Sequence, residues 1–312
     1  MSTTAREGTP ILDRLAAGPI SWGVCEVPGW GLQLPPDRVL AEMRSLGIRA
    51  TESGPDGYLG RDPGLVRQLL GRHHLELVGG FLPVVLHDPA RLGRSLDAAR
   101  ATAALFGELG ASVLCSAIVL DDDWSAPRPL TAGEWRHLLA ALPLLDDIAG
   151  EHGLTHALHP HWGTLVEQDA EVTRVVDESE VALCLDTGHL TLGGTDAARL
   201  AAEHSGRIAH AHLKDVDTAV AGRLRAGELA LVPAVQEGLF RPLGDGDAPV
   251  RETVNSLESA GYAGWYVLEQ DMALAAEPEE GAGPVADARR SIEFLRTFDR
   301  DGATAAAAAE GR

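Results

Sequence analysis

Lysine is almost absent from this chain of 312 residues, because all but one of its 26 lysine and arginine side chains are arginines. Acidic residues outnumber these basic ones by 46 to 26, and the formal net charge is −20. The acids are spread along the whole chain and would repel a polyanionic partner such as DNA or an anionic membrane surface. We therefore expect neither a nucleic acid nor a membrane as partner, and small neutral or weakly charged substrates fit better.

Cysteines are few, and long apolar runs are missing. Cys25, Cys115 and Cys184 are far apart and show no CxxC spacing, which suggests neither a disulfide framework nor a zinc knuckle. Cys115 and Cys184 lie in apolar runs and are expected to be small buried hydrophobes. No segment reaches 18 apolar residues, and the first residues lack the apolar stretch of a signal peptide. We expect a cytoplasmic protein.

Short β-like runs alternate with longer helical ones, which is typical of a parallel sheet covered by helices. Prolines or capping residues at Pro36, Pro63, Pro89, Thr131 and Thr195 mark helix starts. Eight strands are predicted, at residues 20–24, 47–52, 75–81, 112–117, 155–159, 182–186, 208–212 and 265–269. Because eight is the number of strands in a TIM barrel, the sequence predicts an α/β protein with a single (β/α)8 barrel.

The barrel is expected to fill residues 18–300. An N-terminal extension of residues 1–17 would precede it, and a flexible, alanine-rich C-terminal tail of residues 301–312 would follow it. Residues 216–247 form a long insertion after the seventh strand, and long insertions in compact domains are usually functional lids or mobile segments. We find no boundary that divides the barrel itself.

Polar residues gather at the C-terminal ends of the predicted strands, where TIM barrels place their active sites. This set is Glu52, His159, His161, Asp186, His189, His212 and Glu269. Because side chains alternate along a strand, His210, His212 and Lys214 lie on one side of the seventh strand. The same alternation pairs Cys184 with Asp186 and Val267 with Glu269. It predicts that the smaller residues fill the barrel and that acids and imidazoles form the layer above them.

Asp186, His212 and Glu269 together would form a metal site of two carboxylates and one imidazole, without a thiolate. Such ligands suit manganese, cobalt, magnesium or zinc, and oxygen-rich octahedral coordination favours the first two. A fourth ligand must come from the fifth strand or its loop, where the candidates are His159, His161 and Glu167. Each residue alone has an ordinary alternative as a helix cap or a core histidine. Their occurrence at four adjacent strand ends favours a metal site.

Five motifs follow one another in the second half of the chain: LHPHWGTLVE, LCLDTGHLTLGG, RIAHAHLKDV, FRPLGDGD and GYAGWYVLEQD. In this order they resemble the inosose dehydratase branch of the xylose isomerase-like TIM-barrel superfamily, over residues 18–298. The resemblance implies manganese or cobalt held by Asp186, His212, Glu269 and an acid near the fifth strand. Other branches have a glutamate where this chain has His159, and we expect Glu167 to replace it.

The resemblance and the site together predict chemistry next to a carbonyl group. A metal that chelates a hydroxyl and the adjacent carbonyl would stabilise an enediolate. We expect a metal-dependent lyase, a dehydratase or β-eliminase of a keto-inositol or keto-sugar, with His161 or His159 as proton acceptor and His189 as acid partner. The residues expected to bind this sugar or cyclitol substrate are Lys214, Glu52 and Arg241.

Other functions stay open at this point. A sugar isomerase or epimerase could use the same metal site, although an epimerase needs bases on both faces of its substrate. A nuclease of the AP-endonuclease type would need a basic face, which the net charge opposes. A Schiff-base aldolase would use Lys214, whose position beyond the strand end fits a charged rim residue better. A non-catalytic metal-binding partner subunit and a homo-oligomer also stay open.

Overall fold

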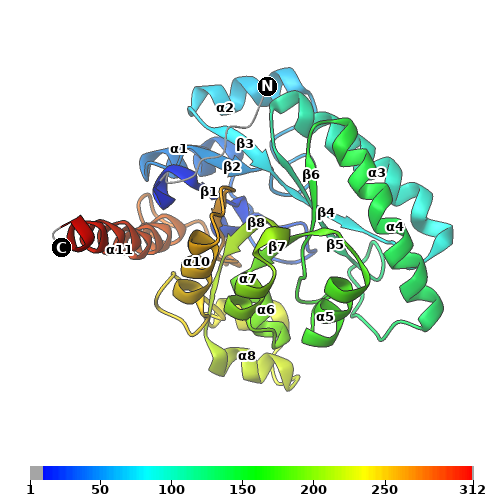
Figure 1. The fold of residues 1–312 in the computed structure, drawn as a ribbon. Coiled ribbons are helices and arrows are strands. Elements are labelled where there is room, and N and C mark those ends of the chain that lie inside the picture. Colours follow the sequence, from blue (N-terminus) through cyan, green and yellow to red (C-terminus); the bar gives the residue numbers. More distant parts are fainter. Residues whose placement is uncertain (1–9, 311–312) are drawn as a thin grey trace.

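The computed structural model describes residues 10–310. It shows a barrel of parallel strands surrounded by helices (Figure 1). The main sheet has the order β3-β2-β1-β11-β8-β7-β6-β5-β4, and its neighbouring strands pair in parallel. The strands are β1 (Leu15–Ala17), β2 (Ala50–Glu52), β3 (Glu76–Gly79), β4 (Phe81–Val84), β5 (Val113–Ile118), β6 (Thr155–Leu158), β7 (Ala182–Asp186), β8 (Ile208–Leu213) and β11 (Tyr266–Leu268). The predicted TIM barrel is confirmed.

The barrel closes between β3 and β4, which are two halves of one strand interrupted at Gly80. The backbone N–H of Ser53 donates to the carbonyl of Gly79, and that of Cys115 donates to the carbonyl of Gly80, both at 3.0 Å. A Cβ at Gly80 would collide with Ser53 and with the ring of Phe106, which explains the glycine. The nine strands of the sheet therefore occupy eight barrel positions, and the predicted third strand becomes two.

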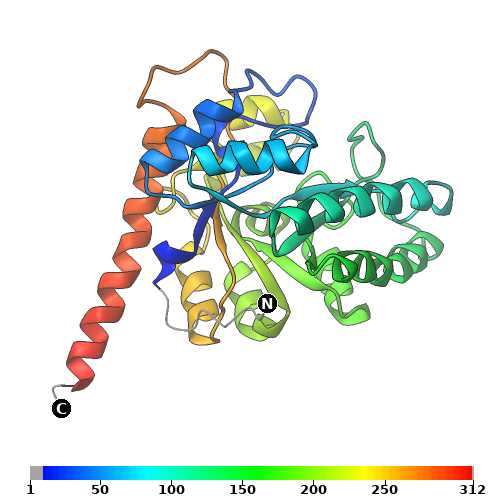
Figure 2. The same ribbon diagram turned by 90° about the horizontal axis from the view of Figure 1, so that it is seen from above.

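Helices cover the outside of the barrel, and α11 extends beyond it at one side (Figures 1 and 2). They are α1 (Pro36–Ser45), α2 (Pro63–Arg72), α3 (Pro89–Leu109), α4 (Ala132–Glu151), α5 (Asp169–Glu178), α6 (Thr187–Gly193), α7 (Ala197–Glu203), α8 (Thr218–Arg225), α9 (Leu231–Gln236), α10 (Val250–Ser259) and α11 (Pro284–Glu310), with short 3-10 turns at η1 (Ile11–Arg14), η2 (Pro19–Trp22) and η3 (Ser205–Arg207). Thr131 caps α4 through a capping box with Glu134, as expected. The predicted cap at Thr195 is wrong, because Asp196 caps α7 by accepting from the N–H of Arg199.

The first strand lies earlier in the chain than predicted. Residues 20–24 do not form a strand, because Pro19 opens η2 and Gly23 ends it with a left-handed φ of 80°. The first barrel strand is β1, which pairs with β2 and β11. This strand lies within residues 1–17, which the sequence analysis assigned to an N-terminal extension. Residues 1–9 lie outside the described part of the chain.

The insertion after β8 is folded rather than an irregular loop. A short strand β9 (Asp215–Val216) pairs antiparallel with β10 (Phe240–Arg241), and α8 and α9 lie between them. Their apolar side chains pack in a small cluster with Trp30. At the other end of the chain, α11 continues to Glu310 where a flexible tail from residue 301 was expected. Alanine has the highest helix propensity, which explains the difference, and residues 311–312 lie outside the description.

Small residues fill the lower part of the barrel interior, as the alternation predicted. They form two clusters, with Ala16, Ala50, Val78 and Val267 in one and Val113, Cys115, Ala157 and Cys184 in the other. The larger core lies between the barrel and its helices. Within residues 10–310, none of the helices combines the length and the apolarity that a membrane crossing requires.

Candidate active site and metal centre

The C-terminal ends of the strands open into a cavity of about 400 Å³. Its wall carries several aromatic rings, those of Trp30, Phe81, Trp124, Trp162 and Phe240, and its floor is polar, with Glu52, His159, His189, Lys214, Glu269 and Asp271. Trp124 has a φ of 56°, which is unusual for a residue other than glycine, and its ring stacks on Phe81 with centroids 6.0 Å apart. Strain of this kind is often kept at functional sites.

Asp186 and His212 meet Glu269, which lines this cavity at its floor. The register pairs both Asp186 and Val267 with His212. Glu269 lies two residues beyond Val267 and so points to the same side, one step further along its strand. His212 Nδ1 lies 3.2 Å from Glu269 Oε2 and 3.7 Å from Asp186 Oδ2. All three residues are buried, and their ligand atoms lie within 4.8 Å of one another.

The two carboxylate oxygens of Asp186 differ in their contacts. Its Oδ1 accepts hydrogen bonds from the backbone N–H groups of Gly188 and His189 at the start of α6. Its Oδ2 is buried and has no hydrogen-bond partner among the described residues. The ordinary capping interpretation of the DTG motif therefore applies to one oxygen only, and the other is available to a ligand.

Lys214 is buried beside the carboxylates and is not the rim residue that the sequence suggested. Its Nζ lies 2.6 Å from Asp271 Oδ1, 3.1 Å from Glu269 Oε2 and 3.5 Å from Asp186 Oδ2. Burial opposes its charge, but these three carboxylates outweigh burial and raise the pKa of Lys214 well above its usual value. The ammonium stays protonated, which argues against a Schiff-base nucleophile for this electrostatic reason.

Two glycines leave room for these charged side chains. A Cβ at Gly188 would lie 2.6 to 2.9 Å from the aliphatic stem of Lys214. A Cβ at Gly18 would lie 2.8 Å from Glu269 Oε1. The glycine of the DTGH motif is thus required by close packing against the lysine of the HLKD motif.

His161 and His189 are neutral imidazoles that face each other across the cavity floor, with centroids 3.8 Å apart. His161 Nδ1 donates to the carbonyl of Trp162 at 2.7 Å, which leaves a lone pair on Nε2. Burial and the charges of His159 and Lys214 lower the pKa of His161 to about 3. Burial also lowers the pKa of His189, whose Nε2 accepts a hydrogen bond of 2.9 Å from the ammonium of Lys214.

His159 lies beside Asp186, and Glu167 lies elsewhere on the cavity wall. His159 Nε2 lies 3.6 Å from Asp186 Oδ2, and neither ring nitrogen has a hydrogen-bond partner within residues 10–310. Glu167 lines the cavity, but its Oε2 accepts from the backbone N–H of Gly163. It belongs to none of the groups of potential ligands found among the described residues.

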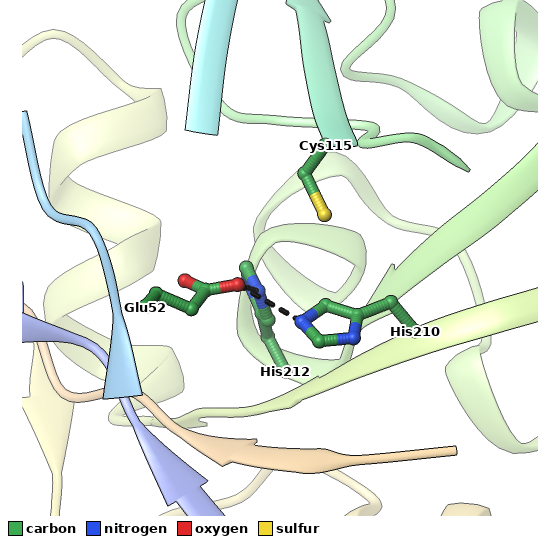
Figure 3. Close-up of side chains that lie close together, drawn as sticks. All are labelled: Glu52, Cys115, His210 and His212. Carbon is green, nitrogen blue, oxygen red and sulfur yellow. Dashed lines mark hydrogen bonds and ion pairs between the residues drawn. The ribbon is translucent and has the colours of Figure 1, made fainter. Parts of the chain in front are cut away.

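Two residues expected to bind substrate are engaged elsewhere. Arg241 forms an ion pair with Asp217 at 2.8 Å and is not among the residues that line the cavity. Glu52 reaches the cavity floor, but its Oε1 accepts from His210 Nε2 at 2.9 Å and from His212 Nε2 at 3.1 Å (Figure 3). Glu52 therefore fixes the ring of His212 so that Nδ1 faces Asp186 and Glu269.

The sequence reasoning missed Asp271, which holds the ammonium of Lys214. Burial raises the pKa of Asp271 to about 6, although Lys214 opposes the shift. Asp271 follows Glu269 by two residues, so the same alternation that grouped His212 with Lys214 could have found it.

Asp215, the neighbour of Lys214 in the chain, has a structural role, because its carboxylate accepts hydrogen bonds from the backbone N–H groups of Val216, Gly244, Gly246 and Ala248. It thereby fixes the loop that carries the GDGD motif.

The buried charges fit a divalent cation. Three buried carboxylates, those of Asp186, Glu269 and Asp271, lie near the single ammonium of Lys214. Buried charges without compensation cost several kcal/mol each, so the excess of carboxylates favours an additional cation. The oxygen ligands of Asp186 and Glu269 with the imidazoles of His212 and His159 are a donor set that manganese, cobalt and zinc accept.

Comparison with known proteins identifies relatives over most of the chain. Residues 40–298 match the family described as xylose isomerase-like TIM barrel. The inosose dehydratase of Geobacillus kaustophilus (strain HTA426) is 34% identical over 279 residues, which cover 84% of this chain and 89% of that protein. The rhizopine catabolism protein MocC of Rhizobium meliloti is 33% identical over 267 residues, which cover 83% of this chain and 81% of that protein.

Solved structures share the fold. D-allulose 3-epimerase from Methylomonas sp., in complex with D-allulose, has a TM-score of 0.68 at 17% identity and covers 94% of this chain and 99% of its own. The IOLI protein with a bound zinc atom has a TM-score of 0.67 at 14% identity and covers 90% of this chain and 97% of its own. The predicted family resemblance is thus confirmed, and this chain belongs to the xylose isomerase-like TIM barrel family.

Proposed function

We propose that the protein is a divalent-metal-dependent dehydratase of a keto-inositol or a closely related keto-cyclitol. The observation that carries the proposal is the arrangement of the cavity floor. Asp186, His212 and Glu269 form a ligand group, and the neutral His161 and the protonated Lys214 line the same cavity. The relatives named inosose dehydratase support the choice of a cyclitol over an open-chain sugar.

A bound divalent ion, most suitably manganese or cobalt, would supply Lewis-acid stabilisation of negative charge on a substrate oxygen. Its holders would be Asp186, His212, Glu269 and His159. Glu52 keeps the ring of His212 in place through the hydrogen bond to Nε2. The aromatic wall of the cavity limits the access of water to the site.

Proton removal next to the ketone is assigned to His161. Its Nε2 carries the free lone pair, because Nδ1 is committed to the carbonyl of Trp162. The lowered pKa keeps the ring neutral at ordinary pH, so the lone pair stays available. The electron pair of the broken C–H bond forms the new C=C bond, while the hydroxyl on the next carbon leaves.

Proton delivery to the departing hydroxyl is assigned to Lys214 together with His189. The ammonium lies 2.9 Å from His189 Nε2 and 2.6 Å from Asp271, so neighbouring groups can hold and replace its proton. The hydroxyl takes this proton and leaves as water. The remaining enol tautomerises to a 1,2-diketone, which completes the balance of a dehydration.

A sugar epimerase is the second candidate, because D-allulose 3-epimerase shares the fold. Epimerisation needs bases on both faces of the substrate. In the described cavity His161 is neutral and can accept a proton, whereas Lys214 is protonated and can only donate one. This asymmetry favours elimination over reprotonation from the opposite face.

Metal-stripped protein should show no turnover of a keto-inositol and should regain it when manganese or cobalt is added. A panel of keto-inositols, keto-glycosides and ketohexoses, followed by mass spectrometry for loss of water, tests the reaction and its substrate class together. Loss of water from the keto-inositols alone is the expected result. Isomerised ketohexoses of unchanged mass would instead assign the epimerase function.

His159→Ala should weaken manganese or cobalt binding at least tenfold, since the variant removes a ligand whose ring nitrogens have no other partner. Calorimetric titration of the metal-free protein measures this affinity directly. Glu167→Ala is the control, because Glu167 lines the same cavity outside the ligand groups. Loss of metal in Glu167→Ala with normal binding in His159→Ala would restore the original assignment of Glu167 as fourth ligand.

A further inference from the structure

A second group of potential ligands lies inside the barrel. It consists of Glu52 on β2, Cys115 on β5, and His210 and His212 on β8 (Figure 3). All four residues are at most 3% exposed, and one ligand atom from each lies within 4.8 Å of the others. We call these four residues the inner cluster, and only His212 belongs also to the group with Asp186 and Glu269.

The geometry of the inner cluster converges on one small volume. Nε2 of His210 and Nε2 of His212 lie 2.9 and 3.1 Å from the same oxygen, Oε1 of Glu52. The thiol of Cys115 approaches this volume from the opposite side of the barrel (Figure 3). Hydrogen bonds alone can explain how Glu52 meets two histidines, so Cys115 is the member that distinguishes a metal site.

The barrel interior around the inner cluster departs from the usual filling. TIM barrels mostly pack valine, isoleucine and leucine into these layers. Here Ala16 and Ala50 form a small cluster with Val78 and Val267, and a buried carboxylate and two imidazoles take the place of aliphatic side chains. Buried polar groups are costly unless they are paired or bind a metal, which favours a ligand for this set.

The chemistry of the inner cluster differs from that of the cavity floor. One thiolate, two imidazoles and one carboxylate are the ligand types that zinc takes in tetrahedral protein sites. The charges of the thiolate and the carboxylate would cancel those of a zinc ion, so the buried complex would be neutral. The softer thiolate also favours zinc over manganese, which prefers oxygen ligands.

We propose that Glu52, Cys115, His210 and His212 form a zinc site inside the barrel, below the site on the cavity floor. Binding releases the thiol proton of Cys115 to solvent, while the ring protons of His210 and His212 move from Nε2 to Nδ1 so that both histidines coordinate through Nε2. A neutral His212 therefore holds either this ion or one beside Asp186 and Glu269. The ring of His212 then lies between the two sites, because its Nδ1 faces Glu269 and Asp186. Glu52 lines the cavity, which gives the ion a path of entry.

Cobalt is the probe for this site, because a cobalt–thiolate bond gives a charge-transfer absorption band that imidazole and carboxylate ligands do not give. Metal-free full-length protein titrated with cobalt should develop this band, and added zinc should remove it. Cys115→Ala should lose the band. Cys25→Ala is the matched control, because Cys25 lies in the cavity wall outside all ligand groups, and it should keep the band.

Two further variants make the result decisive. Cys184→Ala should keep the band, although Cys184 packs in one cluster with Cys115. Cys115→Ser preserves the side-chain size and should weaken cobalt binding at least tenfold, which separates loss of a ligand from loss of the fold. Thermal unfolding and manganese binding of Cys115→Ala check that the barrel is intact. A band that survives in Cys115→Ala, that disappears only in Cys184→Ala, or that never forms in the native protein would overturn the proposal.

Discussion

Glu269→Gln is expected to lower kcat/KM by about 10³-fold or more while the barrel stays folded. The amide has the size of the carboxylate, but it lacks the charge that both the metal group and Lys214 require. Glu269 Oε2 lies 3.2 Å from His212 Nδ1 and 3.1 Å from Lys214 Nζ. The charges of His212 and Lys214 outweigh burial and lower the pKa of Glu269 to about 2, so the native side chain is ionised in neutral solution.

Steady-state kinetics with saturating manganese or cobalt, together with circular dichroism, measure this effect. Glu167→Gln provides the same chemical change in the same cavity, outside the ligand groups, and should lose less than tenfold. A fully active Glu269→Gln variant is incompatible with the proposed site.

Lys214→Met is expected to lower kcat by about 10² to 10⁴-fold, the range attributed to a positioned proton donor. The same change removes the only ammonium near Asp186, Glu269 and Asp271, while methionine keeps much of the aliphatic stem. Breaking a buried ion pair costs about 3 to 5 kcal/mol, so metal-free Lys214→Met should unfold at lower denaturant concentration than the native protein. Manganese should restore part of this stability, because the ion replaces the missing positive charge.

Lys214→Arg separates the charge of this residue from its shape. Arginine keeps the positive charge but presents a planar guanidinium, and the stem of Lys214 already fills the space beside Gly188. We expect Lys214→Arg to recover stability without recovering turnover. Equal kcat in Lys214→Met and the native protein would show that His189 or solvent delivers the proton.

The barrel could be predicted from the sequence because each βα unit carries its own local signals. Pro36, Pro63 and Pro89 open helices where expected, and the capping box of Thr131 forms. The first strand was misplaced, since Pro19 and Gly23 turn an apparently β-like stretch into a 3-10 turn. Short strands such as β1 depend on pairing with β2 and β11, which local sequence does not encode.

The cavity floor was partly predictable for a similar reason. Period-two alternation grouped Asp186, His212 and Glu269, because the strands of a parallel barrel bring their ends to one face. Glu52 lies 158 residues before His210 and 160 residues before His212 in the sequence. Their contact forms only when the barrel closes, so the local sequence could not predict it. The burial of Lys214 likewise follows from the cover that Phe240 and the insertion provide, with Nζ 5.2 Å from the centre of the Phe240 ring.

The fate of the substrate in deuterated water tests the central claim most directly. Metal-loaded protein is incubated with a keto-inositol, and nuclear magnetic resonance follows the carbon next to the ketone and its neighbouring hydroxyl. The account predicts loss of one water per turnover, formation of a 1,2-diketone, and no reaction after metal removal. Deuterium exchange into an isomer that keeps all its hydroxyls, or dehydration that persists without metal, would contradict it.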